Sequence, residues 1–366
     1  MLASIALMII GIICILILFK SIRKLNRVEN LRSDELISII IPMRNEEKNI
    51  ENLLNSLVMQ SYKNIQIICV DDNSSDKTYE LARKYPVEVY KTKEKPEDWI
   101  GKSWACLFGV EKAKGDIFIF MDADVSVDYN TVESLMNEYL TDKKTISVMP
   151  YHETKRFYEQ FSFFFNYIQF AANGMGFNND YYYLGLYGPI ILIHKDDYKS
   201  IGTHEAVKNS LIEDVDLGIN LHKKGLGFKL FMGDEGIKYR MYPNGFNALV
   251  QGWCKNQASA AIKTKILILV LVASMIGLYI KIPVVLFKAV ILTNIKEIIV
   301  YTIMYAILVL TLLKTSKNLG NFKGYVYLFY PIYLIFYMYI FLCSLIKKIL
   351  RIPIKWKGRI ININAK

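Results

Sequence analysis

Long apolar segments lie at both ends of this chain and enclose a middle of mixed composition. The first runs from Ser4 to Phe19, and Leu2 and Ala3 extend it close to the roughly 20 residues that cross a bilayer. The other apolar segments follow Lys265 and continue almost to the end of the chain. With 366 residues, the chain has room for one soluble domain of ordinary size between two membrane-associated parts.

Basic residues next to the first apolar segment predict its orientation. The segment lacks the basic start of a cleavable signal peptide, and a basic cluster follows it at residues 20–27. By the positive-inside rule, this cluster places the next domain in the cytoplasm. We therefore expect a multi-pass protein of the cell membrane, with an N-terminal anchor and basic stop at residues 1–27, a soluble domain at 35–255, transmembrane helices at 262–350 and a basic tail at 351–366.

The C-terminal apolar region leaves the number of its spans open. Segments 266–280 and 282–295 are each short for a span, so they form either one long tilted helix or a shallow hairpin. Basic loops at 314–323 and 347–359 both favour the cytoplasmic side, which a single span between them forbids. We expect two to four spans here. The net charge of +11 gathers beside apolar segments, which favours anionic lipid over nucleic acid as a partner.

In the middle of the chain, short apolar strands alternate with amphipathic helices. We expect strands at 36–41, 65–70, 87–90 and 117–121, and helices near 49–59 and 102–114. Near-continuous apolar strands separated by helices indicate an α/β fold with a mostly parallel sheet and helices on both faces. In such sheets, ligands bind beyond the carboxyl ends of the strands.

Polar residues follow three of these strands at that edge. They are Pro42, Arg44 and Glu46 after the first strand, Asp71 and Asp72 after the second, and Asp122 and Asp124 after "IFIFM". Arg44 and Glu46 are either solvated charges or nucleotide contacts. Asp71 and Asp72 begin a segment of turn-forming residues, but we favour a ligand role, in which a carboxylate accepts a hydrogen bond from a base N–H.

The Asp-x-Asp triplet at Asp122 and Asp124 is weak evidence by itself. Residues i and i+2 of an extended segment point to one side, so both carboxylates can face one cation. Mg²⁺ and Mn²⁺ favour such oxygens and bind a substrate diphosphate beside them. The triplet therefore favours a cation site that assists departure of a nucleoside diphosphate. The alternative is a strand end that caps the next turn.

A later acidic pair, Glu213 and Asp214, stands directly before a helical pattern. Acidic residues are favoured in a first helical turn, which is the simpler interpretation. The sharper one is a general base, because sugar transfer with inversion requires a carboxylate opposite the leaving group to take the proton of the acceptor. We favour Asp214 as this base, with Glu213 as its neighbour. The chain has no P-loop or dinucleotide-binding fingerprint.

In order and broad spacing, these motifs resemble those of family 2 glycosyltransferases with a GT-A fold. The resemblance is carried by "IIIPMRNEE", "VDDNSSDKT", "FMDADV" and "IEDVDLG". Longer segments, including "GKSWAC", "GPIILIHKDDY" and "WKGR", are similar to a member of the family that acts on a carotenoid carboxylic acid. The likeness covers nearly the whole chain.

This resemblance implies a UDP-sugar donor, with UDP-glucose expected, and Mg²⁺ or Mn²⁺ at Asp122 and Asp124. It implies a base at Asp214. It also implies substrate contacts, which we place at Pro42, Arg44, Glu46, Asp71 or Asp72, Asp122, Glu213 and Trp253. Processive synthases of the family carry Gln-x-x-Arg-Trp, whereas "QGWCKNQ" lacks the Arg-Trp pair. Transfer of a single sugar is therefore favoured over polymer synthesis.

A lipid or carotenoid acceptor raises two open questions. A carotenoid acid, with an ordinary carboxyl pKa of about 4.3, is already ionised at neutral pH and needs no base. Asp214 then either positions such an acceptor or serves a hydroxyl acceptor. The aromatic run at 156–170 is either core or an interfacial helix where a lipid enters. The rival functions are transfer to a polyprenyl phosphate or glycolipid, and an inactive membrane scaffold that binds nucleotide sugars.

Overall fold

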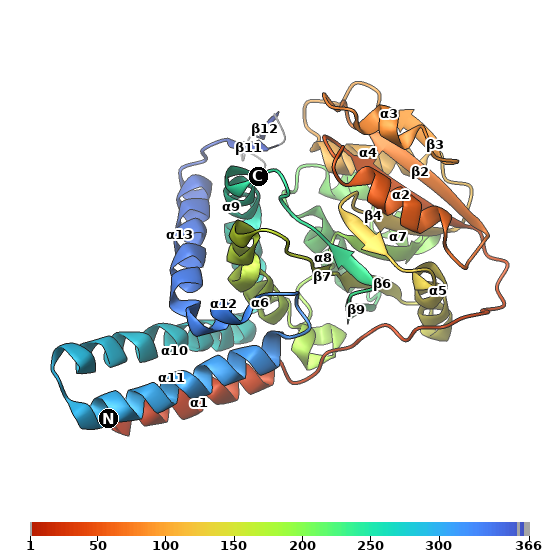
Figure 1. The fold of residues 1–366 in the computed structure, drawn as a ribbon. Coiled ribbons are helices and arrows are strands. Elements are labelled where there is room, and N and C mark those ends of the chain that lie inside the picture. Colours follow the sequence, from red (N-terminus) through yellow and green to blue (C-terminus); the bar gives the residue numbers. More distant parts are fainter. Residues whose placement is uncertain (1, 357–358, 362–366) are drawn as a thin grey trace.

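The computed structural model describes residues 2–356 and 359–361, and it places an α/β domain beside a group of long apolar helices (Figure 1). Seven strands form the central sheet in the order β3-β2-β1-β4-β8-β6-β9. Their bounds are β1 Ile37–Met43, β2 Ile65–Asp71, β3 Glu88–Lys91, β4 Ile117–Met121, β6 Thr145–Met149, β8 Ile190–His194 and β9 Phe228–Met232. A small second sheet has the order β5-β10-β7, from Val125–Val127, Ile237–Tyr239 and Tyr151–His152.

Helices cover both faces of the central sheet. They are α2 Ile50–Val58, α3 Thr78–Ala82, α4 Gly101–Val110, α5 Thr131–Asp142, α6 Phe163–Ala172, α7 Lys195–Ser200 and α8 Glu213–Lys223. Alternate residues of β1 enter opposite cores, since Ile39 and Ile41 pack with α2 and α5, while Ile40 packs with α4. Strands buried on both faces explain the continuous apolar runs in the sequence. The predicted mostly parallel α/β fold is confirmed.

Strand β8 departs from the parallel pattern, because it runs antiparallel to both of its neighbours, β4 and β6. Its amino end therefore lies at the edge of the sheet where the parallel strands have their carboxyl ends. The backbone N–H of Asp122 donates to the carbonyl of Pro189, 3.0 Å away, just before β8 begins. This reversal brings the segment at Gly188 to the ligand-binding edge.

Most of the aromatic run at 156–170 forms core, although Phe157 is 65% exposed. It folds into a 3₁₀ helix, Phe157–Ser162, and α6. Phe163, Phe165 and Phe170 of α6 are completely buried. They lie where α6 packs between the sheet and the helices α10 and α13. Burial of α6 favours the core interpretation for residues 163–170, whereas the exposed Phe157 leaves the interfacial interpretation open for the start of the run.

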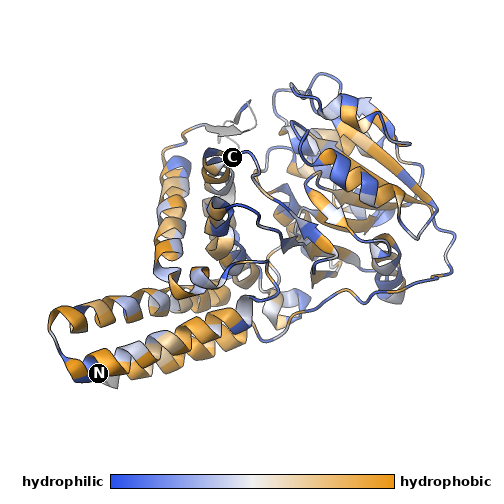
Figure 2. Ribbon diagram, in the orientation of Figure 1, coloured by the Kyte–Doolittle hydropathy of each residue, from blue (hydrophilic) through white to orange (hydrophobic). Residues whose placement is uncertain are grey.

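The apolar ends of the chain form long helices, which are α1 Leu2–Leu18, α9 Phe246–Lys263, α10 Ile266–Ile291, α11 Ile295–Ser316 and α13 Tyr330–Ile349. In the part of the chain that the structure describes, α10, α11 and α13 are long and apolar enough to cross a membrane. Segments 266–280 and 282–295, whose arrangement the sequence left open, form mainly the single helix α10, with Pro283 inside it. Helices α1, α10 and α11 lie side by side and point away from the sheet, and their surfaces are apolar (Figures 1 and 2).

The remaining elements connect these parts. Helix α12, Gly324–Leu328, leads into α13, and strands β11, Ile354–Trp356, and β12, Arg359–Ile361, form a hairpin after it. The hairpin contacts α9. The chain therefore returns from the apolar helices toward the soluble domain.

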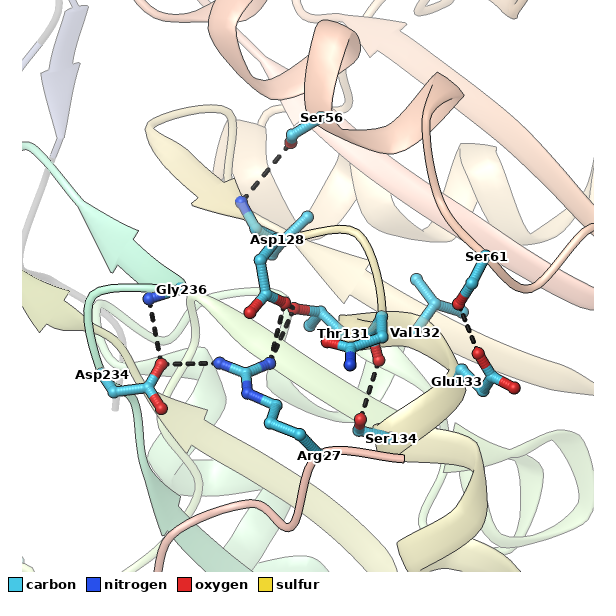
Figure 3. Close-up of polar contacts among 12 residues, drawn as sticks. Arg27, Ser56, Ser61, Asp128, Thr131, Val132, Glu133, Ser134, Asp234 and Gly236 are labelled. Carbon is cyan, nitrogen blue, oxygen red and sulfur yellow. Dashed lines mark hydrogen bonds and ion pairs between the residues drawn. The ribbon is translucent and has the colours of Figure 1, made fainter. Parts of the chain in front are cut away.

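The segment between α1 and β1 is fastened to the soluble domain by Arg27. Figure 3 shows its guanidinium between Asp128 and Asp234, at 2.8 and 2.6 Å from their carboxylate oxygens. The same side chain donates to the hydroxyl of Thr131 at 3.1 Å. At the next residue, the N–H of Val28 donates to the hydroxyl of Ser134 at 3.0 Å. These contacts hold the segment after α1 in a defined position against the α/β domain.

Replacing Arg27 should loosen this attachment. In Arg27→Met, Asp128 and Asp234 lose their shared cation. We expect the free energy of unfolding to fall by about 1 kcal/mol and the segment before β1 to be digested faster by a protease. Thermal unfolding and limited proteinase K digestion of the detergent-solubilised chain measure both effects. Arg32→Met, at an exposed position of the same segment, is the matched control. Equal behaviour of the two variants would contradict the role given to Arg27.

Candidate active site

A cavity of about 940 Å³ opens at the edge of the sheet where β1, β2 and β4 end. It extends from there to α6, α9 and α13. The predicted site residues that line it are Pro42, Arg44, Glu46, Asp72, Asp122, Asp124, Glu213, Asp214 and Trp253. Residues from distant parts of the sequence thus meet in one space. Asp71 is the predicted residue that is not part of its lining.

Asp71 and Asp72 have different environments at the end of β2. Asp71 is buried, and its Oδ2 accepts a hydrogen bond from the N–H of Ser74 at 3.2 Å, so it stabilises the turn. Asp72 is also buried but faces the cavity. Its Oδ1 accepts no hydrogen bond from the described residues. Of the two, Asp72 is the residue placed to accept a hydrogen bond from a ligand N–H.

Arg359, in the C-terminal hairpin, reaches back to Asp72. Its Nη1 forms an ion pair with Oδ2 of Asp72, and its Nη2 donates to the Asp72 carbonyl at 3.3 Å. The first residue of α4 must be glycine for this contact, because a Cβ on Gly101 would lie 2.1 Å from Asp72 Oδ2 and 2.7 Å from Arg359 Nη1. Arg359 was not among the site residues predicted from the sequence, although it is the last residue of the "WKGR" segment that carries part of the resemblance.

Three cations surround the Asp72 carboxylate. Burial raises the pKa of Asp72, an effect that the charges of Arg359, Arg44 and Lys95 oppose. Arg44 Nη1 also donates to the carbonyl of Asn73 at 2.9 Å. Arg44, Lys95 and Arg359 all line the cavity. This end of the cavity is therefore suited to the negative charge of a diphosphate.

Lys102 lies between the two acidic motifs that the sequence separates by about 90 residues. Its Nζ is 2.8 Å from Asp122 Oδ1 and 3.2 Å from Glu213 Oε1. Burial lowers the pKa of Lys102, but the charges of Asp122, Glu213 and Asp214 raise it well above its usual range. Lys102 was not among the residues predicted from the sequence. The only feature of the sequence that points to it is its position in the "GKSWAC" segment, which carries part of the resemblance.

Glu213 and Asp214 occupy the first turn of α8 and share the field of Lys102. Burial raises the pKa of Glu213, but Lys102 and Lys255 lower it below its usual range. Burial and the charge of Glu213 raise the pKa of Asp214 to about 6. Asp214 is therefore the carboxylate of this pair with the greater affinity for a proton near neutral pH.

The Asp214 carboxylate is held by two backbone N–H groups. Its Oδ1 accepts from Val215 at 2.9 Å, which is the helix-terminal role expected from the sequence, and its Oδ2 accepts from Gly188 at 2.8 Å. A Cβ at Gly188 would lie 2.9 Å from Asp214 Oδ2 and 3.0 Å from Lys102 Nζ. A glycine at this position therefore allows the backbone before β8 to approach Asp214 and Lys102 closely. The helix-turn and cavity interpretations of Asp214 are compatible.

Asp122 and Asp124 follow β4 directly, with Ala123 between them, and both line the cavity. Hard divalent cations bind one or two carboxylates together with substrate phosphates, and this pair fits that donor set. Among the described residues, no group of three or more His, Cys, Asp or Glu side chains is arranged to hold a metal. A cation here would therefore need oxygens from a diphosphate to complete its coordination.

The other end of the cavity reaches the long helices and is lined by both apolar and polar side chains, the polar ones including Gln169, Gln251 and Gln257. Ile168 and Ala172 of α6, Ala248 and Ala261 of α9, and Tyr337 of α13 line it. Trp253 is nearly buried beside this end, where it stacks on Phe165 at 4.6 Å between ring centroids and donates to Ser162 at 3.1 Å. Lys255 adds a cation to the α9 wall. The cavity thus joins a charged end to an end with apolar side chains from α6, α9 and α13, which we call the apolar end.

Comparisons with known proteins agree with this arrangement. A model of Glycosyl transferase family 2 matches residues 38–186. The 4,4'-diaponeurosporenoate glycosyltransferase of Staphylococcus aureus strain USA300 is 31% identical over 341 residues, covering 88% of this chain and 87% of that protein. The protein of the same name from strain MRSA252 is 36% identical over 239 residues, covering 63% of this chain and 62% of that protein.

A solved mannosyltransferase from Pyrobaculum calidifontis, in complex with GDP-Man and Mn²⁺, superposes with a TM-score of 0.52. The alignment covers 94% of this chain and 97% of that one at 14% identity, so it shows a shared fold alone. The GT-A type fold expected from the sequence is confirmed.

Removing the Arg359 guanidinium should weaken binding at the charged end of the cavity. Arg359→Ala leaves the Asp72 carboxylate without its ion-pair partner and takes one cation from the wall, so we expect UDP to bind about tenfold more weakly. Isothermal titration with UDP and Mn²⁺ measures the change. Arg351→Ala, at an exposed position before the hairpin, is the control. Unchanged affinity in Arg359→Ala would exclude a role at the nucleotide end.

Proposed function

We propose that this chain, which belongs to glycosyl transferase family 2, transfers one sugar from a UDP donor to an apolar, acidic acceptor at the cytoplasmic face of a membrane. The observation that carries the proposal is that one cavity joins Asp72, Asp122 and Asp214 to apolar side chains of α6, α9 and α13. Glucose is our choice of sugar, on the basis of the sequence resemblance. The reaction is expected to invert the configuration at the anomeric carbon.

The donor is assigned to the charged end. The free oxygen of Asp72 is placed to accept the N–H of a uracil, and Pro42, Arg44 and Glu46 line the wall beside it. The diphosphate then lies toward Arg44, Lys95 and Arg359. Asp122 and Asp124 would hold Mg²⁺ or Mn²⁺, which supplies positive charge to the leaving diphosphate.

The acceptor is assigned to the apolar end. The Staphylococcus aureus relative is named for a carotenoid acid, and an acid of this kind suits the structure, because an apolar tail can lie among α6, α9 and α13. Lys255 supplies a cation beside its head. An uncompensated carboxylate would be repelled by Glu213 and Asp214, and Lys102 and Lys255 offset that repulsion.

The chemistry differs between a carboxylate and an alcohol. A carboxylate oxygen attacks the anomeric carbon of the sugar, the bond from that carbon to the diphosphate breaks, and UDP leaves with the electron pair. No proton has to be removed. An alcohol must lose its proton in the same step, and Asp214 is the carboxylate placed to take it. Asp214 is thus a base for alcohols and a positioning group for acids.

The rival functions make different products. A transferase for polyprenyl phosphates would give a sugar-phosphate lipid, and a scaffold would bind the nucleotide without turnover.

To test the proposal, membranes containing the chain are incubated with labelled UDP-sugars and Mn²⁺, and the organic extract is examined for a glycosylated apolar acid. Asp124→Ala should abolish product formation, because it removes one of two predicted cation ligands. A water-soluble polymer, or no turnover by the unaltered chain, would overturn the proposal.

Asp214 should matter more for alcohols than for acids. We expect Asp214→Asn to lower kcat by about 10²- to 10⁴-fold with a polyene alcohol and far less with the matching acid. Because the raised pKa of Asp214 is about 6, activity toward the alcohol should fall as the pH drops below that value and the carboxylate becomes protonated. Retinol and retinoic acid form a suitable pair for steady-state rates. Equal, severe losses with both acceptors would show that Asp214 acts in another way.

A further inference from the structure

Helix α13 is preceded and followed by contacts with the same soluble domain. Before it, the side chain of Asn321 accepts from the N–H of Thr154 at 2.6 Å and donates to its carbonyl at 3.1 Å. After it, Arg359 forms the ion pair with Asp72. A helix that crossed the bilayer once would separate its two flanks by a hydrocarbon core of about 30 Å. Contacts of both flanks with one domain oppose such a crossing.

The neighbour of α13 leads to the same conclusion. Helix α13 packs along α9, where Ser344 accepts from the N–H of Ala258 at 3.2 Å and Lys348 donates to Ser259 at 3.0 Å. Helix α9 carries Lys255 on the wall of the cavity. If α13 crossed the membrane, α9 and this charge would be drawn into hydrocarbon, at a considerable free-energy cost.

One face of α13 is an unbroken exposed apolar stripe. It consists of Ile332, Ile335, Tyr339, Leu342, Ile346 and Ile349, each at least half exposed and spaced alternately by three and four residues. This spacing keeps all six on one side of a helix. The opposite face, including Tyr333 and Tyr337, is buried against the protein. The stripe therefore needs an apolar environment, while the other face needs the soluble domain.

Direction and charge identify that environment. Helix α13 runs crosswise to α1, α10 and α11 (Figure 1), and all four helices consist largely of hydrophobic residues (Figure 2). Basic residues lie near both ends of α13. They are Lys314, Lys317 and Lys323 before the helix, and Lys347, Lys348 and Arg351 at its C-terminal end. Each lysine or arginine near an anionic membrane surface adds about 1 kcal/mol of attraction.

We propose that α13 does not cross the membrane but lies along its cytoplasmic surface, with the stripe in the lipid and the flanking lysines and arginines at anionic headgroups. Helices α1, α10 and α11 then make the crossings. Both basic loops, 314–323 and 347–359, lie on the cytoplasmic side, which removes the conflict in the charge pattern. This topology goes beyond the proposed function and does not depend on which sugar is transferred.

The placement also gives the cavity access to lipid. Tyr337 lies on the buried face of α13 and lines the apolar end of the cavity. With α13 at the surface of the bilayer, that end lies directly behind the helix, on the side that faces the soluble domain. An apolar acceptor would therefore reach the site by passing α13 from the lipid surface. This consequence rests on the proposed function, whereas the topology itself does not.

Labelling of introduced cysteines by a membrane-impermeant maleimide tests the topology in sealed vesicles of known orientation. We expect Lys317→Cys and Arg351→Cys to react from the cytoplasmic side and Thr293→Cys, between α10 and α11, to react from the other side. Reaction of Arg351→Cys on the side opposite to Lys317→Cys would overturn the proposal. The unaltered chain, whose five cysteines are mostly buried, supplies the background.

Fluorescence quenching identifies what covers the stripe. A polarity-sensitive dye on Tyr339→Cys is examined in vesicles of equal parts phosphatidylcholine and phosphatidylglycerol, with quenchers attached near the headgroup or near the end of the acyl chain. Stronger quenching by the shallow quencher is expected. Stronger quenching by the deep quencher would indicate a crossing, and quenching by neither would indicate a second copy or another protein on the stripe. Both results would contradict the proposal. UDP binding by each variant confirms that it is folded.

Discussion

The ion pairs of Lys102 are the interaction on which the site depends. Asp122, Asp124, Glu213 and Asp214 all line one cavity, and like charges so close together repel strongly where water is partly excluded. Lys102 lies within 3.2 Å of two of these residues and joins the loop after β4 to the start of α8. It thereby offsets the repulsion and orients the carboxylates. Glu213 is kept charged, and its charge in turn makes Asp214 the more basic neighbour.

The sheet topology makes this convergence possible. Parallel strands bring Pro42, Asp72 and Asp122 to one edge, but they do not bring the acidic pair at the start of α8. The reversed strand β8 completes the site, because its amino end carries Gly188, whose N–H binds Asp214. A side chain at Gly188 would collide with both Asp214 and Lys102. One antiparallel strand therefore links the nucleotide edge of the sheet to the candidate base.

The long apolar helices are built into the site as well as attached to it. The aromatic residues of α6 fill the space between sheet and helices, and Phe165 supports Trp253 beside the cavity. The C-terminal hairpin returns from α13 and places Arg359 on Asp72. Residues near both ends of the chain thus contact the soluble domain, through Arg27 on one side and Arg359 on the other. The charged end of the cavity, its apolar end and the long apolar helices are therefore parts of one packed unit.

The sequence by itself determined the α/β class, the strands that carry the acidic motifs and the apolar ends of the chain. It also determined eight of the residues that line the cavity, which we predicted because they lie at the ends of strands or at the start of a helix. These are Pro42, Arg44, Glu46, Asp72, Asp122, Asp124, Glu213 and Asp214. These features follow from local periodicity and from the rule that parallel strands end at one edge. Asp71 and Asp72 were indistinguishable in the sequence, and only the turn that binds Asp71 separated them.

Only the tertiary structure decided the roles of Lys102 and Arg359, the reversal of β8 and the course of α13. Each depends on a contact between residues far apart in the chain, as between Arg359 and Asp72. Hydropathy cannot distinguish a helix that crosses lipid from one that lies on it, because both need an apolar face. The distinction comes from what the other face and the two flanks of the helix touch.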